Sequence, residues 1–136
     1  MSTLTILARY AYIAGVWLFL VAITVQVLIA GLAIFGDPRD IDLHRTLGYL
    51  LHLSPVAILI AAAVGRVERA TLLWVGALVA VTLIQPLLPA IGSDNPLVAA
   101  LHPVLALVIF AIAARLAWAS PALLPGRQAP GAEDAH

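Results

Sequence analysis

AYIAGVWLFLVAITVQVLIAGLAIF, the run from Ala11 to Phe35, contains no charged side chain. As one helix, it is long enough to cross a hydrocarbon core of about 30 Å. Its apolar length exceeds the roughly 7–15 residues typical of a secretory signal, and polar Gln26 lies inside it. We therefore predict a membrane-spanning helix that the mature protein retains.

Three further apolar runs follow, over Leu43–Val64, Thr71–Leu88 and Leu97–Trp118. Of the 136 residues, 63% are hydrophobic and 10% are charged, which is too apolar for a soluble domain of this length. The sequence predicts an all-α integral membrane four-helix bundle in residues 1–118, built from two tandem helical hairpins. Residues 119–136 are rich in Pro, Ala and Gly and are predicted to form a disordered cytoplasmic tail.

Composition also limits the chemistry and the partners. The chain has no cysteine, which excludes disulfides, thiolate metal sites and cysteine nucleophiles. Its net charge is zero and it has no basic patch, so we expect no nucleic acid partner. The predicted spans contain no Ser-His-Asp set, phosphate loop or carboxylate pair. The sequence therefore predicts the lipid bilayer as a partner and no independent catalytic activity.

The charges are distributed unevenly between the two ends of such a bundle. All seven basic residues are arginines, and two of them, Arg39 and Arg45, fall on one side together with four aspartates. The other side holds the remaining five: Arg9, Arg66, Arg69, Arg115 and Arg127. The positive-inside rule then predicts that both termini are cytoplasmic.

The second half of the chain repeats the first, over units of approximately residues 10–64 and 70–118. Asp37-Pro38 and Asn95-Pro96 each resemble an N-cap followed by the first residue of a helix. A Leu-His pair then follows in both copies, with the histidine six residues after the proline. These histidines are His44 and His102.

A glutamine precedes each of these motifs, inside the preceding apolar run. Gln26 lies 12 residues before Pro38, and Gln85 lies 11 residues before Pro96. Two tandem copies of this unit predict parallel hairpins related by an axis along the membrane normal. Because polar side chains within spans usually face the bundle interior, we expect the glutamines to tie helices together.

His44 and His102 are candidate axial ligands of a single metal ion. Both lie roughly 9 Å below the start of their helices, and the second and fourth helices of a bundle can be diagonal neighbours. Two facing neutral imidazoles suit haem iron, which predicts a haem b site between them. His52, about 12 Å deeper and without a repeat partner, is the alternative ligand. Hydrogen bonding between helices is the competing interpretation of all three histidines.

Three neighbouring residues complete the predicted cofactor-binding set. Gly48 and Ala106 lie four residues after His44 and His102, on the same helix faces, where small residues would admit a flat macrocycle. Arg45 follows His44 at the outer interface, where it would pair with a haem propionate or extend to the lipid headgroups.

At Asp42-Leu43-His44-Arg45-Thr46-Leu47-Gly48 and Ala100-Leu101-His102-Pro103 the chain resembles one four-helix half of heme A synthase. That family holds haem between histidines of its second and fourth helices, which implies that His44 and His102 are the axial pair. The chain is also similar to small four-helix bacterial membrane proteins of an uncharacterised family, which implies the bacterial inner membrane.

The chain departs from heme A synthase in two respects. That enzyme has eight helices and needs both halves, so oxidation of a haem substituent is not implied here. Its acidic residue three positions before the histidine is replaced by Ile41, between Asp40 and Asp42.

Three functions compete on this sequence. The first is a b-type haem electron-transfer protein, a small cytochrome b-like subunit of a larger membrane redox complex, since two histidine ligands leave no open position on the iron. The second is a haem-free structural or accessory subunit of a membrane complex. The third is a metal-dependent enzyme using His44, His52 and His102, which the offset of His52 disfavours.

Overall fold

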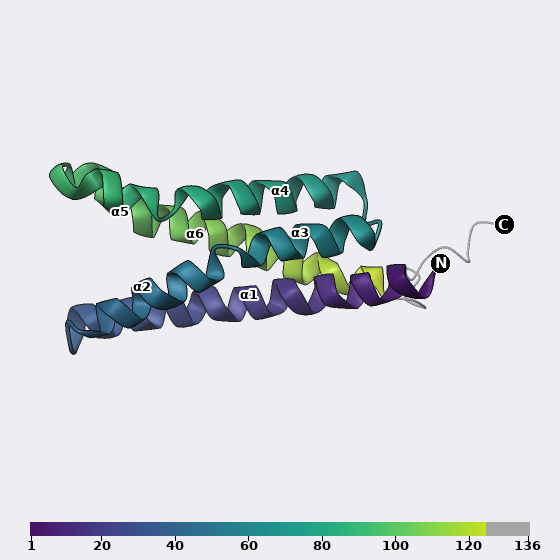
Figure 1. Cartoon of the computed structure of the whole chain (residues 1–136), viewed down its shortest axis with the longest axis horizontal. Helices are drawn as coiled ribbons and strands as arrows, with labels where there is room; N and C mark the ends of the chain where they lie inside the picture. Colours follow the sequence, from purple (N-terminus) through teal and green to yellow (C-terminus); the bar gives the residue numbers. More distant parts are fainter. Residues whose placement is uncertain (125–136) are drawn as a thin grey trace, which may run out of the picture.

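The computed structural model describes residues 1–124, and in this part of the chain every regular element is helical (Figure 1). The elements, in chain order, are α1 (Thr3–Phe35), α2 (Asp40–Leu51), α3 (Ser54–Val64), α4 (Arg69–Ile84), α5 (Leu87–Ile91), η1 (Gly92–Asp94), α6 (Pro96–Ala119) and η2 (Ser120–Leu123). They form four helices, Thr3–Phe35, Asp40–Val64, Arg69–Ile91 and Pro96–Leu123, that are long and apolar enough to cross a membrane. The predicted all-α four-helix architecture is confirmed.

Two of the four spans are broken by proline. The second span changes direction at His52 and Leu53, just before Pro55, and the third changes direction at Gln85 and Pro86. Proline has no amide hydrogen to donate, and its ring collides with the carbonyl one turn earlier. Pro103 behaves differently, because it lies inside α6 without ending the helix.

One of the two predicted helix caps forms and the other does not. Asn95 caps α6 as predicted, since its side chain accepts from the amides of Leu97 and Val98. The carboxylate of Asp37 instead accepts from the amide and guanidinium of Arg39, and α2 begins only at Asp40. The side-chain hydrogen bond from Arg39, and then the one from its amide, lower the pKa of Asp37.

The four spans are arranged in a square. The first span packs against the second and the fourth, and the third span also packs against the second and the fourth. Within residues 1–124, α1 does not contact α4, and neither α2 nor α3 contacts α6. The second and fourth spans, which contain His44 and His102, are therefore diagonal neighbours.

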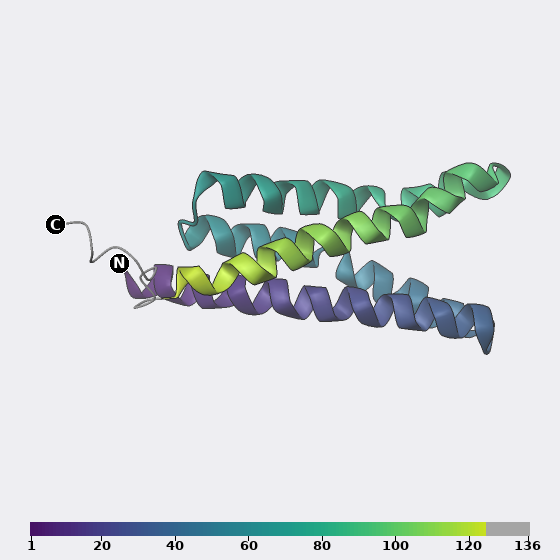
Figure 2. The same ribbon diagram turned by 180° about the vertical axis from the view of Figure 1, so that it is seen from behind.

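The hydrophobic core occupies only one half of the bundle. Its members come from all four spans and cluster toward the end that holds the chain's first residues: Tyr12, Val16, Phe19, Leu20, Ile58, Ala62, Val67, Val75, Leu78, Ile109, Ile112, Ala113, Leu116 and Ala117. Neither α2 nor α5 contributes a buried residue. At that other end the hairpin of α1 and α2 diverges from the hairpin of α5 and α6 (Figures 1 and 2).

The closed end of the bundle brings the beginning of α1 next to η2. Arg9 donates from Nε to the carbonyl of Gly65 (2.9 Å) and from Nη1 to the carbonyl of Leu123 (3.4 Å). Ser120 is buried and bonds the carbonyl of Ala117. Residues 120–123, predicted as the start of a disordered tail, instead form η2 because Ser120 packs and Arg9 binds the last turn. The remainder of that predicted tail, residues 125–136, lies outside the described residues.

Candidate cofactor site

His44 and His102, the candidate ligands, are each joined to the glutamine of their own hairpin by two hydrogen bonds. Gln26 Nε2 donates to the backbone carbonyl of His44 (3.1 Å), and His44 Nδ1 lies 3.2 Å from the backbone carbonyl of Gln26. Gln85 and His102 repeat both contacts, at 2.9 and 3.0 Å. The glutamines therefore tie helices together as expected, and the identical contacts support an internal repeat.

These contacts determine which ring nitrogen carries the proton. A carbonyl oxygen only accepts a hydrogen bond, so Nδ1 must be the donor in both rings. Nε2 then keeps its lone pair, on the edge of the ring that faces away from the neighbouring helix. An Nδ1–H donated to a backbone carbonyl is the usual outer contact of a metal-binding histidine.

The two imidazole rings approach one another from opposite hairpins. The centroids of the His44 and His102 rings are 6.1 Å apart, and their planes make an angle of 76°. The backbones of their elements, α2 and α6, do not come close to one another in the described part of the chain. The rings therefore meet across the space that opens where the hairpins diverge.

That space is a cavity of about 630 Å³. Its volume lies within the roughly 300–1,000 Å³ typical of ligand pockets. Four residues of the predicted cofactor-binding set, His44, Gly48, His102 and Ala106, line it. Most of the remaining wall is apolar: Ile23, Val27, Ala30, Gly31, Ile34, Leu51, Pro103, Leu107, Ile109 and Phe110.

Arg45, the fifth residue of that set, is not among the residues that line the cavity. Its Nη1 bonds Asp42 Oδ1 at 3.2 Å, and its side chain is 66% exposed. Gly48 has a role that the sequence did not reveal, because a Cβ at this position would lie 3.2 Å from Gln26 Nε2. The glycine lets the amide of Gln26 approach α2.

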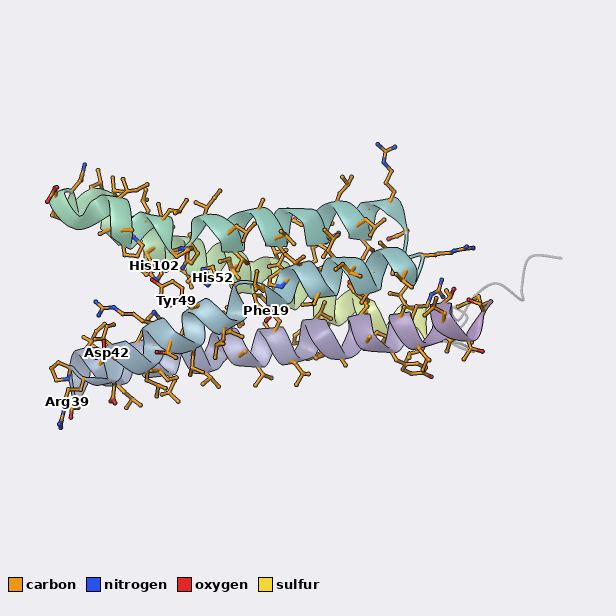
Figure 3. The ribbon with its side chains drawn as sticks, viewed as in Figure 1. Phe19, Arg39, Asp42, Tyr49, His52 and His102 are labelled. Carbon is orange, nitrogen blue, oxygen red and sulfur yellow. The ribbon has the colours of Figure 1, made fainter. Side chains whose placement is uncertain are left out.

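His52 also lines the cavity, near the point where the hairpins diverge (Figure 3). The helix break before Pro55 leaves the carbonyl of Gly48 without its usual helical partner, since the amide of His52 bonds Tyr49 instead. His52 Nδ1 takes that place by bonding the Gly48 carbonyl. Its Nε2 is buried and has no hydrogen-bond partner in the described residues.

Three more buried side-chain atoms have no partner within residues 1–124, namely Gln26 Oε1, Gln85 Oε1 and Thr82 Oγ1. All three residues line the same cavity. Sequence analysis did not single out Thr82, because a lone threonine in an apolar helix usually bonds its own backbone. The one available signal was its position a single turn before Gln85.

Residues 1–124 form no site with three or more protein ligands. Among the described residues, no three His, Asp or Glu side chains are grouped closely enough to hold a metal ion. The enzyme hypothesis that required His44, His52 and His102 as joint ligands is therefore not supported. The geometry offers two ligands, His44 and His102, on opposite walls.

Fold and site together define a membrane-type four-helix bundle with a paired-histidine cavity between two diverging hairpins. Residues 26–91, just under half of the chain, match the model of a family of unknown function, DUF6220. That match includes both glutamines and His44 but not His102. No curated protein and no solved structure matches the chain. The resemblance to heme A synthase therefore rests on the residues quoted above.

Proposed function

We propose that this protein is a membrane electron-transfer protein that binds one b-type haem between His44 and His102. The observation that carries the proposal is the pair of reciprocal glutamine–histidine contacts, which leave both Nε2 atoms unprotonated on opposite walls of one cavity. A helix-packing role alone needs neither a free lone pair nor a cavity.

The spacing of the rings fits two ligands on one iron. If His44 and His102 held one metal ion through bonds of about 2.0–2.1 Å, their ring centres would lie roughly 6 Å apart. The centroids here are 6.1 Å apart.

The chain's own residues would bind and orient the cofactor. The backbone carbonyls of Gln26 and Gln85 hold the Nδ1–H groups and so fix the direction of both lone pairs. Gly48 and Ala106 are small and so leave room for a flat ring beside the ligands, and the apolar side chains that line the rest of the cavity disfavour water. Bound haem supplies one-electron chemistry, and two histidine ligands leave no open position for oxygen.

Arg45 is the remaining member of the proposed site. Its guanidinium is exposed next to the helical turn that contains His44 and bonds only Asp42 among the described residues. An exposed pair of this kind contributes about 0–1 kcal/mol, so little opposes its exchange for a propionate at the mouth of the cavity. We propose that exchange as its role.

The proposed setting is the bacterial inner membrane, with both termini in the cytoplasm. The beginning of α1, the turn between α3 and α4 with the start of α4, and the end of α6 lie at the same end of the bundle (Figure 1), and these segments contain Arg9, Arg66, Arg69 and Arg115. Arg115 lies 4.8 Å above the Trp74 ring, an arrangement suited to the interface that tryptophan prefers. The loops are short, which favours a small subunit within a larger membrane redox complex.

A reduced-minus-oxidised spectrum of the purified full chain tests the proposal. We expect about one low-spin b-type haem in the wild type, and its loss or conversion in His44→Ala and in His102→Ala. His52→Ala is the matched control, because it removes a cavity histidine that is not proposed as a ligand.

Two results would contradict this assignment. A colourless wild type, prepared with adequate haem supply, would leave the haem-free structural or accessory subunit as the better function. A normal spectrum in His44→Ala together with loss in His52→Ala would move the ligand to the alternative residue, His52.

A further inference from the structure

A cleft of about 440 Å³ lies at the closed end of the bundle, away from the paired histidines. Its wall comes from the beginning of α1, the turn between α3 and α4, the start of α4 and the last turns of the fourth span, which meet there (Figure 1). Three charged residues line it, Arg9, Arg66 and Glu68, and we call it the arginine cleft. It shares no residue with the proposed haem site.

The hydroxyl of Tyr12 faces the arginine cleft without a hydrogen-bond partner. Tyr12 lines the cleft and is 1% exposed. Its hydroxyl forms no hydrogen bond within residues 1–124, yet it is not among the unpaired side-chain atoms that are fully enclosed. The small exposed part of Tyr12 is therefore its hydroxyl, which a ligand in the cleft can reach. Because a buried tyrosine hydroxyl usually has a partner, this one points to a ligand.

Arg9 lines the same cleft and has hydrogen-bond donors to spare. Its Nε donates to the carbonyl of Gly65 and its Nη1 to the carbonyl of Leu123, which fixes the guanidinium. A guanidinium has five N–H donors in a rigid fork, so the remaining ones are available to a ligand. The ion pairs within residues 1–124 are those of Arg39 and Arg45, so no carboxylate in this part of the chain neutralises Arg9.

Arg66 occupies a backbone conformation in which glycine is usual. Its φ is 51°, the one positive value among the described non-glycine residues. The amide of Arg66 bonds the carbonyl of Ala63, and the amide of Val67 bonds that of Ala62, which is a Schellman motif with residue 66 in its left-handed position. An L-residue is strained there, because its Cβ crowds the following carbonyl. The turn itself would be more stable with glycine, so its geometry does not explain the arginine.

The glycine of this turn lies one residue earlier and serves the contact with α1. A Cβ on Gly65 would lie 3.2 Å from Cγ and 3.3 Å from the backbone nitrogen of Arg9. Its absence lets α1 come close enough for Arg9 Nε to reach the Gly65 carbonyl. The dipeptide Gly65-Arg66 therefore brings two guanidinium groups to one cleft.

The charges that line the cleft match a singly charged anion. Two arginines and one glutamate leave a net charge of +1. The glutamate, Glu68, accepts a hydrogen bond from the Thr71 hydroxyl at 3.3 Å. A phosphodiester carries one negative charge, and its oxygens accept from guanidinium and hydroxyl groups alike. A phosphomonoester carries about −1.5 to −2 at neutral pH and is less well matched beside Glu68.

The tryptophans place the arginine cleft at the level of the lipid headgroups. Trp74 is three residues after Thr71 and Trp118 directly precedes Ala119, so each lies within one turn of a cleft residue. The ring of Trp17 lies beside that of Trp118, with centroids 5.5 Å apart. All three rings belong to residues at least 38% exposed, and exposed tryptophan prefers the membrane interface. A phosphodiester at this depth is that of a lipid.

We propose that the arginine cleft binds the phosphodiester of a glycerophospholipid headgroup. Arg66 and the free N–H groups of Arg9 donate to the phosphate oxygens, and the Tyr12 hydroxyl donates to one of them. Ala122 and Leu123, which also line the cleft, give the glycerol and the first methylenes an apolar wall. Free phosphate in water offers the same acceptor chemistry and is the other source. The proposal does not depend on the haem site.

Native mass spectrometry of the full chain, delipidated in a phosphate-free maltoside detergent, distinguishes these sources. Dioctanoyl phosphatidylglycerol is the phosphodiester probe, and dioctanoylglycerol and inorganic phosphate are the controls. We expect one saturable adduct of the phospholipid and no saturable binding of either control. Equally tight binding of inorganic phosphate would refute a lipid headgroup as the ligand, and equally tight binding of dioctanoylglycerol would refute a phosphate site.

Two tyrosines provide a matched pair of variants. Tyr12→Phe removes only the hydroxyl and is expected to weaken phospholipid binding roughly 2- to 12-fold, the equivalent of one net hydrogen bond. Tyr10 is 51% exposed and does not line the cleft, so Tyr10→Phe should leave the affinity unchanged. An unchanged affinity in folded Tyr12→Phe, checked by circular dichroism, would refute the hydroxyl contact.

The arginine of the strained turn separates binding from stability. Arg66→Gly relieves the strain, so its unfolding should require more denaturant than that of the wild type. The same variant should bind the phospholipid about fivefold more weakly, the contribution of one basic residue near an anionic lipid. Arg69→Ala removes an equal charge outside the cleft and should leave the affinity nearly unchanged. Equal weakening in the two arginine variants would show a general attraction to positive charge and refute the site.

Discussion

Replacing Gln85 by leucine removes one hydrogen bond and one unpaired acceptor at the same time. The lost bond is Nε2 to the His102 carbonyl, at 2.9 Å. Hydrogen bonds between membrane helices contribute about 0.6 kcal/mol on average. The removed Oε1 is buried without a partner, a condition that costs about 1–3 kcal/mol. The two terms oppose each other and leave a net rise in the free energy of unfolding of roughly 0.4 to 2.4 kcal/mol.

Haem retention, in contrast, should be insensitive to this substitution. The proposed ligand His102 is oriented through Nδ1 by the backbone carbonyl of residue 85, at 3.0 Å, and leucine keeps that carbonyl. A change of about 1 kcal/mol corresponds to roughly a fivefold change in affinity. We therefore expect Gln85→Leu to bind haem within about fivefold of the wild type.

The assay is the rate of haem transfer from detergent-solubilised protein to an excess of apo-globin, with unfolding in denaturant measured in parallel. Gln26→Leu makes the same change in the other hairpin and should behave alike, whereas His102→Leu should lose the haem. A more than tenfold faster transfer from folded Gln85→Leu would show that the glutamine side chain, and not the backbone carbonyl, positions the histidine.

Three further outcomes are expected. Gly48→Ala should keep the haem content, because the other hairpin already has Ala106 at the matching position. It should change the free energy of unfolding by about 1 kcal/mol at most, because the better helix propensity of alanine offsets one tight contact. A colourless variant would contradict this. Arg45→Ala should lower haem retention a few-fold more than Arg39→Ala at equal expression. Equal haem occupancy in the two variants would show that Arg45 forms only its surface ion pair with Asp42. Reporters fused to the C-terminus and to the loop near Asp94 should be active on the cytoplasmic and outer sides respectively, and the reverse would overturn the topology.

The architecture was predictable because it depends on length and apolarity alone. Four apolar runs of spanning length have few alternatives to helices in a bilayer, where every backbone group needs an internal partner. The helix breaks were only partly predictable, since Pro55 and Pro86 interrupt their spans while Pro103 does not. Which proline breaks a helix depends on whether neighbouring groups can donate to the freed carbonyl.

The candidate site was predictable in position but not in orientation. Equal spacing from the prolines predicted that His44 and His102 correspond, and their matching glutamine contacts agree with that. The sequence contained no information on the direction of either ring. It also could not predict the contact between His52 and the Gly48 carbonyl, because that carbonyl is free only after the helix breaks.

The cavity has an outer level, lined by His44 and His102, and a deeper level, lined by His52 and Thr82. A chain built from a tandem repeat is expected to be symmetric only where its function needs two equal groups. Two ligands for one iron call for symmetry, and the outer level is symmetric, with one glutamine–histidine pair from each hairpin. Holding iron calls for no polar group deeper down, where an unpaired nitrogen costs about 1–3 kcal/mol. His52 and Thr82 nevertheless break the repeat at that level, opposite apolar counterparts. The repeat is therefore strict where the proposed ligands lie and relaxed one level deeper, which is the pattern expected if the paired histidines, and not the bundle as a whole, require the symmetry.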